Sequence, residues 1–222
     1  MAPTLEVPGD ERAAARRAAE LIAAAGVAAV ADHGYFGFAM SGGRSPWAML
    51  AILGELEDMP WSQTELFQVD ERVAAPGSED RNLTHMVLGL SMEHQTALRP
   101  MPVTQRDLDG AAREYESTLP ERFDLVHLGL GPDGHTASLV PGDPVLEVAD
   151  RRVAMTGGEY QGHPRMTLTY PAIDAAREIV WLVTGAEKRD ALAKLLAGDD
   201  SIPAGRVQND AITVVADEAA AG

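Results

Sequence analysis

The chain contains 222 residues, of which 45% are apolar and 23% are charged. These values are typical of a soluble globular protein and predict a single domain spanning residues 1–222. The 34 acidic residues outnumber the 18 basic ones, which gives a formal net charge of −16. This excess argues against binding to nucleic acid or to an anionic membrane, and an anionic ligand would need a locally basic pocket.

The sequence contains no cysteine, which excludes a disulfide framework and a thiolate metal site. Residues 1–17 lack the basic-then-apolar order of a signal peptide. No apolar run approaches the ~18 residues expected of a membrane span. We therefore expect a cytoplasmic protein, a monomer or weak homo-oligomer, with no membrane or nucleic-acid partner.

Hydrophobic periodicity, glycines and prolines divide the chain into alternating strands and helices. In chain order the predicted elements are helix 10–31, strand 35–40, helix 47–56, strand 66–69, helix 83–90, helix 108–119, strand 124–130, strand 152–156, strand 166–169, a turn or short helix at 173–177, strand 179–184, helix 187–196 and strand 212–215. Loops are expected at 73–82, 157–164 and 198–206, whereas 91–107 shows no clear period. This alternation predicts an α/β domain with a mostly parallel central sheet covered on both faces.

The strand predicted at 124–130 ends abruptly in a Gly-Pro-Asp-Gly turn at 131–134. The turn carries the carboxylate of Asp133 and leads directly into the imidazole of His135. Ligands of open α/β sheets bind beyond the carboxyl ends of the strands, so His135 is the best candidate for chemistry in the chain. A structural turn whose histidine caps a helix or binds a carbonyl is the open alternative.

A second candidate is the sequence Ser-Gly-Gly-Arg-Ser-Pro at 41–46, between a predicted strand and a predicted helix. Paired glycines allow close approach of the backbone, and N–H groups near a helix N-terminus favour phosphate. Arg44 adds a permanent cation. The pattern is neither a Walker A loop nor a dinucleotide-binding motif, and an ordinary strand-to-helix connection is the alternative.

The third and fourth candidates are Asp70-Glu71-Arg72, after the strand at 66–69, and Lys188, after the strand at 179–184. Three adjacent charges are too costly to bury unpaired, so some of them line a polar cleft or pair with one another. An arginine there offers bidentate recognition of an anion. The alternatives are a surface salt-bridge cluster and a solvated lysine.

These four features all follow strands, and the carboxyl ends of parallel strands meet at one edge of the sheet. The sequence therefore predicts one pocket with a phosphate cradle, two or three cations and one imidazole. Its predicted members are Ser41, Gly42, Gly43, Arg44, Ser45, Asp70, Arg72, Asp133, His135 and Lys188.

Six segments of the chain resemble the 6-phosphogluconolactonase family, which is grouped with the glucosamine-6-phosphate deaminases. In order they are SGGRSP, DERVAAPGSEDRN, LGLGPDGHTASLVPG, MTLTYPAIDAA, WLVTGAEKRDAL and IPAGRV. They cover roughly 35–217, and GPDGHTASL is the most specific of them. The resemblance implies a modified Rossmann-like three-layer sandwich that hydrolyses 6-phospho-D-glucono-1,5-lactone to 6-phosphogluconate in the oxidative pentose phosphate pathway. It implies no metal and no organic cofactor.

The chain departs from the family pattern at the phosphate loop. The family commonly has Ser-Thr or a similar pair at the position of Arg44-Ser45, and often a lysine or other polar residue at the position of Trp47. Arg44 would restore that positive charge. The common Leu-Phe-Pro is replaced conservatively by Leu139-Val140-Pro141.

The hypothesis for the mechanism assigns a role to each candidate. Arg44 and Lys188 neutralise the 6-phosphate on the loop at 41–45, which places the lactone carbonyl beside His135. His135 acts as general base on the attacking water and returns the proton to the ring oxygen. Arg72, with N–H groups of the turn at 131–134, stabilises the oxyanion, and Asp133 orients His135.

Two rival functions are open at this point. In the deaminases an acidic residue within an Asn-Glu-Pro run follows the histidine, whereas Val140 stands before Pro141 here, which favours the lactonase. A non-catalytic sugar-phosphate-sensing domain is the other rival, and the chain offers no basic patch for an attached DNA-binding function. We expect His33, His85, His94, His127 and His163 to be structural or surface residues.

Overall fold

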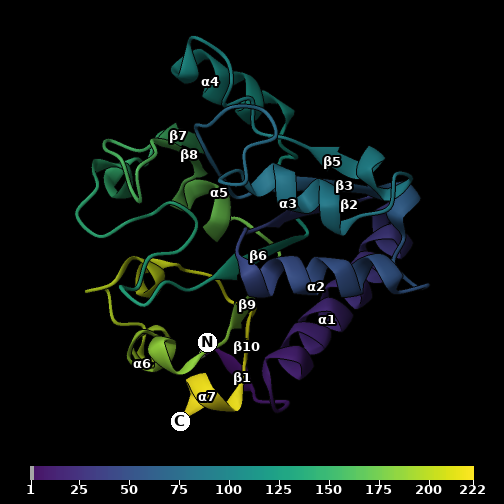
Figure 1. Cartoon of the computed structure of the whole chain (residues 1–222). Helices are drawn as coiled ribbons and strands as arrows, with labels where there is room; N and C mark the ends of the chain where they lie inside the picture. The colour runs from purple at the N-terminus through teal and green to yellow at the C-terminus, as the bar shows by residue number, and fades with distance from the viewer. Residues whose placement is uncertain (1–2) are drawn as a thin grey trace.

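The computed structural model describes residues 3–222. Within this range a parallel sheet of seven strands has the order β1-β10-β9-β6-β2-β3-β5 (Figure 1). Its strands are β1 (Thr4–Glu6), β2 (Phe36–Met40), β3 (Thr64–Gln68), β5 (Leu98–Arg99), β6 (Leu125–Gly129), β9 (Glu178–Val183) and β10 (Ile212–Ala216). The predicted α/β class with a mostly parallel central sheet is confirmed.

Helices cover both faces of this sheet. They are α1 (Glu11–His33), α2 (Arg44–Glu55), α3 (Asn82–Gly89), α4 (Leu108–Thr118), α5 (Tyr170–Asp174), α6 (Arg189–Ala197) and α7 (Glu218–Ala221). Two apolar clusters result: one includes Ile22 of α1, Met49 of α2 and Met86 of α3, and the other includes Ala112 of α4 and Leu192 of α6. In Figure 1, α1 and α2 pack side by side and α4 lies beside β7. None of the helices within residues 3–222 combines the length and the hydropathy that crossing a membrane requires.

The long helix α1 follows directly from its sequence. Asp10 caps its N-terminus by accepting a hydrogen bond from the Ala13 N–H, and Gly34 ends it in the left-handed conformation at φ 81°. The helix continues through Gly26. A side chain at this position would press against the Phe36 ring and Pro60. A glycine in mid-helix is therefore explained by close packing of α1 on β2.

A second, antiparallel sheet was not anticipated. It has the order β4-β8-β7 and consists of β4 (Asp70–Arg72), β7 (Val153–Met155) and β8 (Arg165–Leu168). Asp70, Glu71 and Arg72 follow β3 as predicted, but they form a strand of their own that pairs with β8. The short strands β1 and β5 were also missed, since two or three residues carry no readable period.

The start of α2 also differs from the prediction. Arg44 and Ser45, expected in the loop before a helix at 47–56, form the first turn of α2. Likewise Asn82, placed in the loop at 73–82, is the first residue of α3. Lys188 ends a short 3-10 turn at Ala186–Lys188, and α6 begins after it.

His127 of β6 is fully buried, and neither ring nitrogen finds a hydrogen-bond partner among residues 3–222. Burial lowers the pKa of His127 to about 3. Between about pH 6.5 and pH 3 the unfolded chain binds a proton that the folded chain does not, so stability falls as the pH is lowered, by about 1.4 kcal/mol per pH unit.

We expect His127→Leu to reduce this acid sensitivity. Urea unfolding at pH 7.5 and pH 4.5 should show that the variant loses markedly less stability than the wild type between the two values. Equal losses in both proteins would contradict a neutral buried imidazole.

Candidate active site

A cavity of about 520 Å³ lies at the carboxyl ends of β2, β6 and β9. Nine of the ten predicted site residues line it: Ser41, Gly42, Gly43, Arg44, Ser45, Asp70, Arg72, His135 and Lys188. Asp133, the tenth, contacts His135 instead. The expectation that strand ends would gather these segments is confirmed, because every strand of this sheet within residues 3–222 runs in the same direction.

One wall of the cavity is the N-terminus of α2. Gly43 adopts φ 127°, which favours glycine, and it begins the helix without a side-chain cap. The first N–H groups of a helix have no partner within the helix. They therefore carry partial positive charge at the end of the cavity where Arg44 lies.

Both serines of this loop have structural partners. Ser41 is buried, and its hydroxyl accepts a hydrogen bond from the Gly129 N–H at 3.2 Å, joining β2 to β6. The Ser45 hydroxyl donates to Glu11 Oε1 at 2.8 Å and lies 2.6 Å from the Thr184 hydroxyl. In this structure Ser45 therefore has a carboxylate as its acceptor.

Arg44, Lys188 and Arg72 line the cavity without an ion pair within residues 3–222, but Arg72 donates hydrogen bonds to Asp80 and Asn82. Burial lowers the pKa of Lys188, and Arg44 lowers it further, whereas Glu187 and Asp133 act in the opposite direction. An anion bound between Arg44 and Lys188 would relieve their mutual repulsion. Their placement therefore suits a phosphate group.

Asp133 and His135 form a direct pair. His135 Nδ1 lies 2.5 Å from Asp133 Oδ1, and the His135 backbone N–H donates to the same oxygen at 3.2 Å. The hydrogen bond from His135 holds the pKa of Asp133 well below its usual value, although burial opposes the shift. An ionised carboxylate only accepts hydrogen bonds, so Nδ1 carries the proton and Nε2 keeps its lone pair. His135 is thus arranged as a general base.

Gly131 leaves the space that this pair occupies. A methyl group on its Cα would overlap with the imidazole of His135 and would press against Asp133 Oδ1. The turn also closes on itself, because the Gly131 N–H donates to the His135 carbonyl and the Gly134 N–H donates to the Gly131 carbonyl. The idea that these two N–H groups stabilise an oxyanion is therefore wrong.

We expect Gly131→Ala to slow any reaction in which His135 acts as a base by more than about tenfold while leaving the fold intact, because it displaces His135 from Asp133. Gly54→Ala is the matched control, since a methyl group at Gly54 in α2 meets only ordinary contacts. Steady-state rates and thermal unfolding of both variants would check this. Equal rates in the two variants would contradict the proposed geometry.

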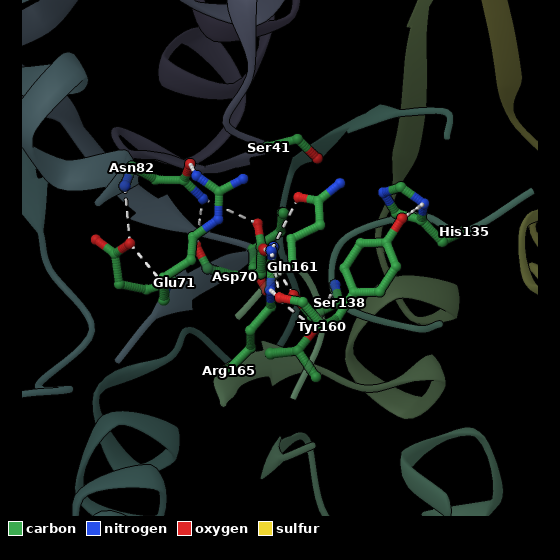
Figure 2. A network of polar contacts seen from close by, with 12 residues as sticks. Ser41, Asp70, Glu71, Asn82, His135, Ser138, Tyr160, Gln161 and Arg165 are labelled. Carbon is green, nitrogen blue, oxygen red and sulfur yellow. Dashed lines mark hydrogen bonds and ion pairs between the residues drawn. The ribbon is translucent and has the colours of Figure 1, made fainter. Parts of the chain in front are cut away.

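Asp70, Asn82 and Ser138 belong to a buried polar network (Figure 2), and Asn82 holds Arg72 at the cavity. Arg72 Nη1 donates to Asn82 Oδ1 at 2.9 Å, and Asn82 Nδ2 donates to Asp70 Oδ1 at 3.1 Å. Asp70 also accepts from the Ser138 hydroxyl at 2.7 Å and lies 3.7 Å from Arg165 Nη1. Asp70 and Arg72 both reach the cavity because they are two residues apart on a strand.

Glu71 points the other way and is fully buried. Its carboxylate accepts from the backbone N–H groups of Asn82 and Leu83, at 2.8 and 2.9 Å, and so caps α3. Arg81 Nε lies 3.4 Å from it. The central charge of the Asp-Glu-Arg cluster therefore fixes the helix that carries Asn82.

Comparison with known proteins identifies the chain. The family model described as glucosamine-6-phosphate isomerases/6-phosphogluconolactonase matches residues 9–216. The chain belongs to this family. A 6-phosphogluconolactonase from Synechocystis is 35% identical over 210 residues, which is 89% of this chain and 86% of the relative.

Solved structures of the glucosamine-6-phosphate isomerase/6-phosphogluconolactonase family have the same fold. The 6-phosphogluconolactonase of Thermotoga maritima superimposes with a TM-score of 0.86 at 25% identity, covering 97% of this chain and 99% of the other. A monomeric glucosamine-6-phosphate deaminase superimposes with a TM-score of 0.83 at 18% identity, covering 98% of each chain. The fold alone therefore does not separate the two activities of the family.

In this family member the cavity includes residues that sequence reasoning did not assign to it. Asn82, Gln161 and Arg165 line it. The glycine at position 42 is the sequence feature that indicates a close neighbour, because a side chain there would overlap with the Asn82 amide. Arg165 and Gln161 reach the cavity through the pairing of β8 with β4, which the sequence does not reveal.

Proposed function

We propose that this enzyme hydrolyses 6-phospho-D-glucono-1,5-lactone to 6-phosphogluconate, a step of the oxidative pentose phosphate pathway. The single observation that carries the proposal is that one cavity combines the cations Arg44 and Lys188 and the N-terminus of α2 with a histidine paired to a carboxylate. The first part suits a sugar phosphate, and the second suits activation of a water molecule. The curated relatives named 6-phosphogluconolactonase support the choice of substrate.

In this mechanism the phosphate is bound by Arg44, Lys188 and the first N–H groups of α2. That remote binding positions C1 of the lactone beside His135. His135 Nε2 takes a proton from the attacking water as the water oxygen bonds to C1. When the bond from C1 to the ring oxygen breaks, the same nitrogen returns the proton to that oxygen, so no net charge is left on the protein.

Arg72 is the proposed oxyanion stabiliser. Its guanidinium is held by Asn82 Oδ1 and the Asp80 carbonyl, and both contacts use Nη1. The buried Nε forms no hydrogen bond within residues 3–222. Because the cation is fixed before substrate arrives, it stabilises developing charge without having to reorganise.

A pH-stat assay on freshly generated lactone tests the function, with spontaneous hydrolysis subtracted. We expect catalysed acid release from the lactone and no ammonia release from glucosamine 6-phosphate. The apolar Val140 supports this preference, since it has no proton to supply for ring opening. Ammonia release would favour the deaminase, whereas binding of either compound without turnover would favour a sensing domain.

We further propose that the enzyme acts in the cytoplasm without a metal or organic cofactor, as a monomer or weak homo-oligomer. The net charge of −16 supports the absence of nucleic acid and anionic membrane partners. Assays in the presence of chelator, and sedimentation over a range of concentrations, test these two points.

A further inference from the structure

Tyr160 lies beside His135 (Figure 2), which is paired with Asp133. Its hydroxyl donates to Asp133 Oδ2 at 3.2 Å and lies 3.3 Å from His135 Nδ1. Its ring meets the imidazole edge-on, with centroids 5.1 Å apart and planes inclined by 63°. Each oxygen of Asp133 therefore has its own partner: Oδ1 contacts His135, and Oδ2 contacts the phenol.

The position of Tyr160 is fixed by a tight hairpin. The Tyr160 N–H donates to the His163 carbonyl at 3.0 Å, and the two residues between them have positive φ, 52° at Gln161 and 82° at Gly162. Two consecutive residues of this kind form the turn that best matches the twist of paired strands. The loop at 157–164 thus presents Tyr160 to Asp133 with a defined backbone geometry.

Arg165 holds the hairpin in place. Its Nε and Nη2 donate to the Tyr160 carbonyl at 3.3 and 3.0 Å, and its guanidinium lies 5.1 Å from the centroid of the Tyr160 ring. Arg165 is only 3% exposed and is anchored by Asp70. The phenol is therefore supported from the buried side of the cavity.

The carboxylate that Tyr160 contacts needs such support. The terminal torsion of an aspartate has a broad energy minimum, and the Asp133 side chain is 38% exposed. Without a partner on Oδ2, water would compete with His135 for hydrogen bonds to the Asp133 carboxylate. The carboxylate plane would then turn away from His135 Nδ1. Burial, and then Asp133, raise the pKa of Tyr160, so the phenol keeps its proton and stays a donor.

We propose that Tyr160 is a positioning residue whose hydroxyl fixes the Asp133 carboxylate and thereby holds His135 with Nδ1 protonated and Nε2 free. This inference rests on the proposed function, in which Nε2 activates water. Tyr160 acts through Asp133 and contacts no reacting atom in that mechanism.

Tyr160→Phe tests the proposal, because it keeps the ring beside Arg165 and removes only the hydroxyl. We expect kcat on the lactone to fall about tenfold, with KM changed less than about twofold and thermal stability unchanged. Tyr35→Phe is the matched control: it also removes a hydroxyl that donates to a carboxylate, Glu65 Oε2 at 2.8 Å, but outside the cavity. Equal kcat values in the two variants would overturn the proposal.

A second measurement does not depend on activity. In protein labelled with ¹⁵N-histidine, the Nδ1 proton of His135, assigned by its absence in His135→Gln, should give a protected resonance that is lost or broadened in Tyr160→Phe and kept in Tyr35→Phe. An unchanged resonance overturns the proposal even if kcat falls, because the hydroxyl would then act on the substrate. If the wild type hydrolyses no lactone, the proposed function fails, and this spectrum alone decides the role of Tyr160.

Discussion

His135→Gln is expected to lower kcat for 6-phosphogluconolactone by about 10²–10⁴-fold, the usual contribution of general acid–base catalysis. The reason is that Asp133 holds Nδ1, whereas Nε2 has no hydrogen bond within residues 3–222. Glutamine fills similar space but provides no base near neutral pH. KM should change little, because the proposed phosphate contacts are made by Arg44, Lys188 and the N-terminus of α2 and not by His135.

His163→Gln is the control for this experiment. His163 lies in the loop at 157–164, where it contacts the Val73 carbonyl and Asp80, and it does not line the cavity. Initial rates must be corrected for spontaneous opening of the lactone. A His135→Gln protein with turnover equal to that of His163→Gln would remove His135 from the mechanism.

The second large effect concerns the phosphate. Arg44→Met and Lys188→Met are each expected to lower kcat/KM by about 10- to 100-fold, mainly through KM, because each removes a charged hydrogen-bond donor from the phosphate. The double variant should lose more than either single one. Higher ionic strength should weaken binding in the wild type more than in the double variant.

Glucono-1,5-lactone lacks the phosphate and is therefore the control substrate for this prediction. Its slow hydrolysis should be the same in the wild type and in both variants, since neither cation has a phosphate to bind. Lys194→Met controls for loss of charge in α6, because Lys194 does not line the cavity. Equal losses on the two lactones would show that Arg44 and Lys188 support the fold or the chemistry and do not bind phosphate.

Much of the site can be predicted from the sequence because the patterns that indicate it involve residues close together in the chain. A buried strand that stops at a glycine-containing turn places the next side chains at a sheet edge, whatever the rest of the chain does. This holds for the loop after β2 and for the turn after β6, so Arg44 and His135 could be assigned from sequence. The contact of Asp133 with His135 is local as well, since two residues on one tight turn meet once Gly131 leaves room.

The remainder of the site depends on long-range pairing. Arg72 and Arg165 face each other in the antiparallel register of β4 and β8, although they are far apart in the chain. Burial and the nearby Arg72 lower the pKa of Arg165, while Asp70 acts in the opposite direction. The strand predicted at 166–169 corresponds to β8, but the three residues of β4 are too few to show a periodicity, so the pairing of β4 with β8 was missed.

The alternation of strands and helices, the common edge at which the strands end and the residues at those ends can all be predicted from the sequence. The polar side chains that support them become known only from the fold: Glu71 under α3, Asn82 against Gly42, and Tyr160 on Asp133. The physical reason is that strand ends and glycine turns are set by neighbouring residues. Buried hydrogen bonds, in contrast, are satisfied by whichever partner the packed sheets and helices bring within reach.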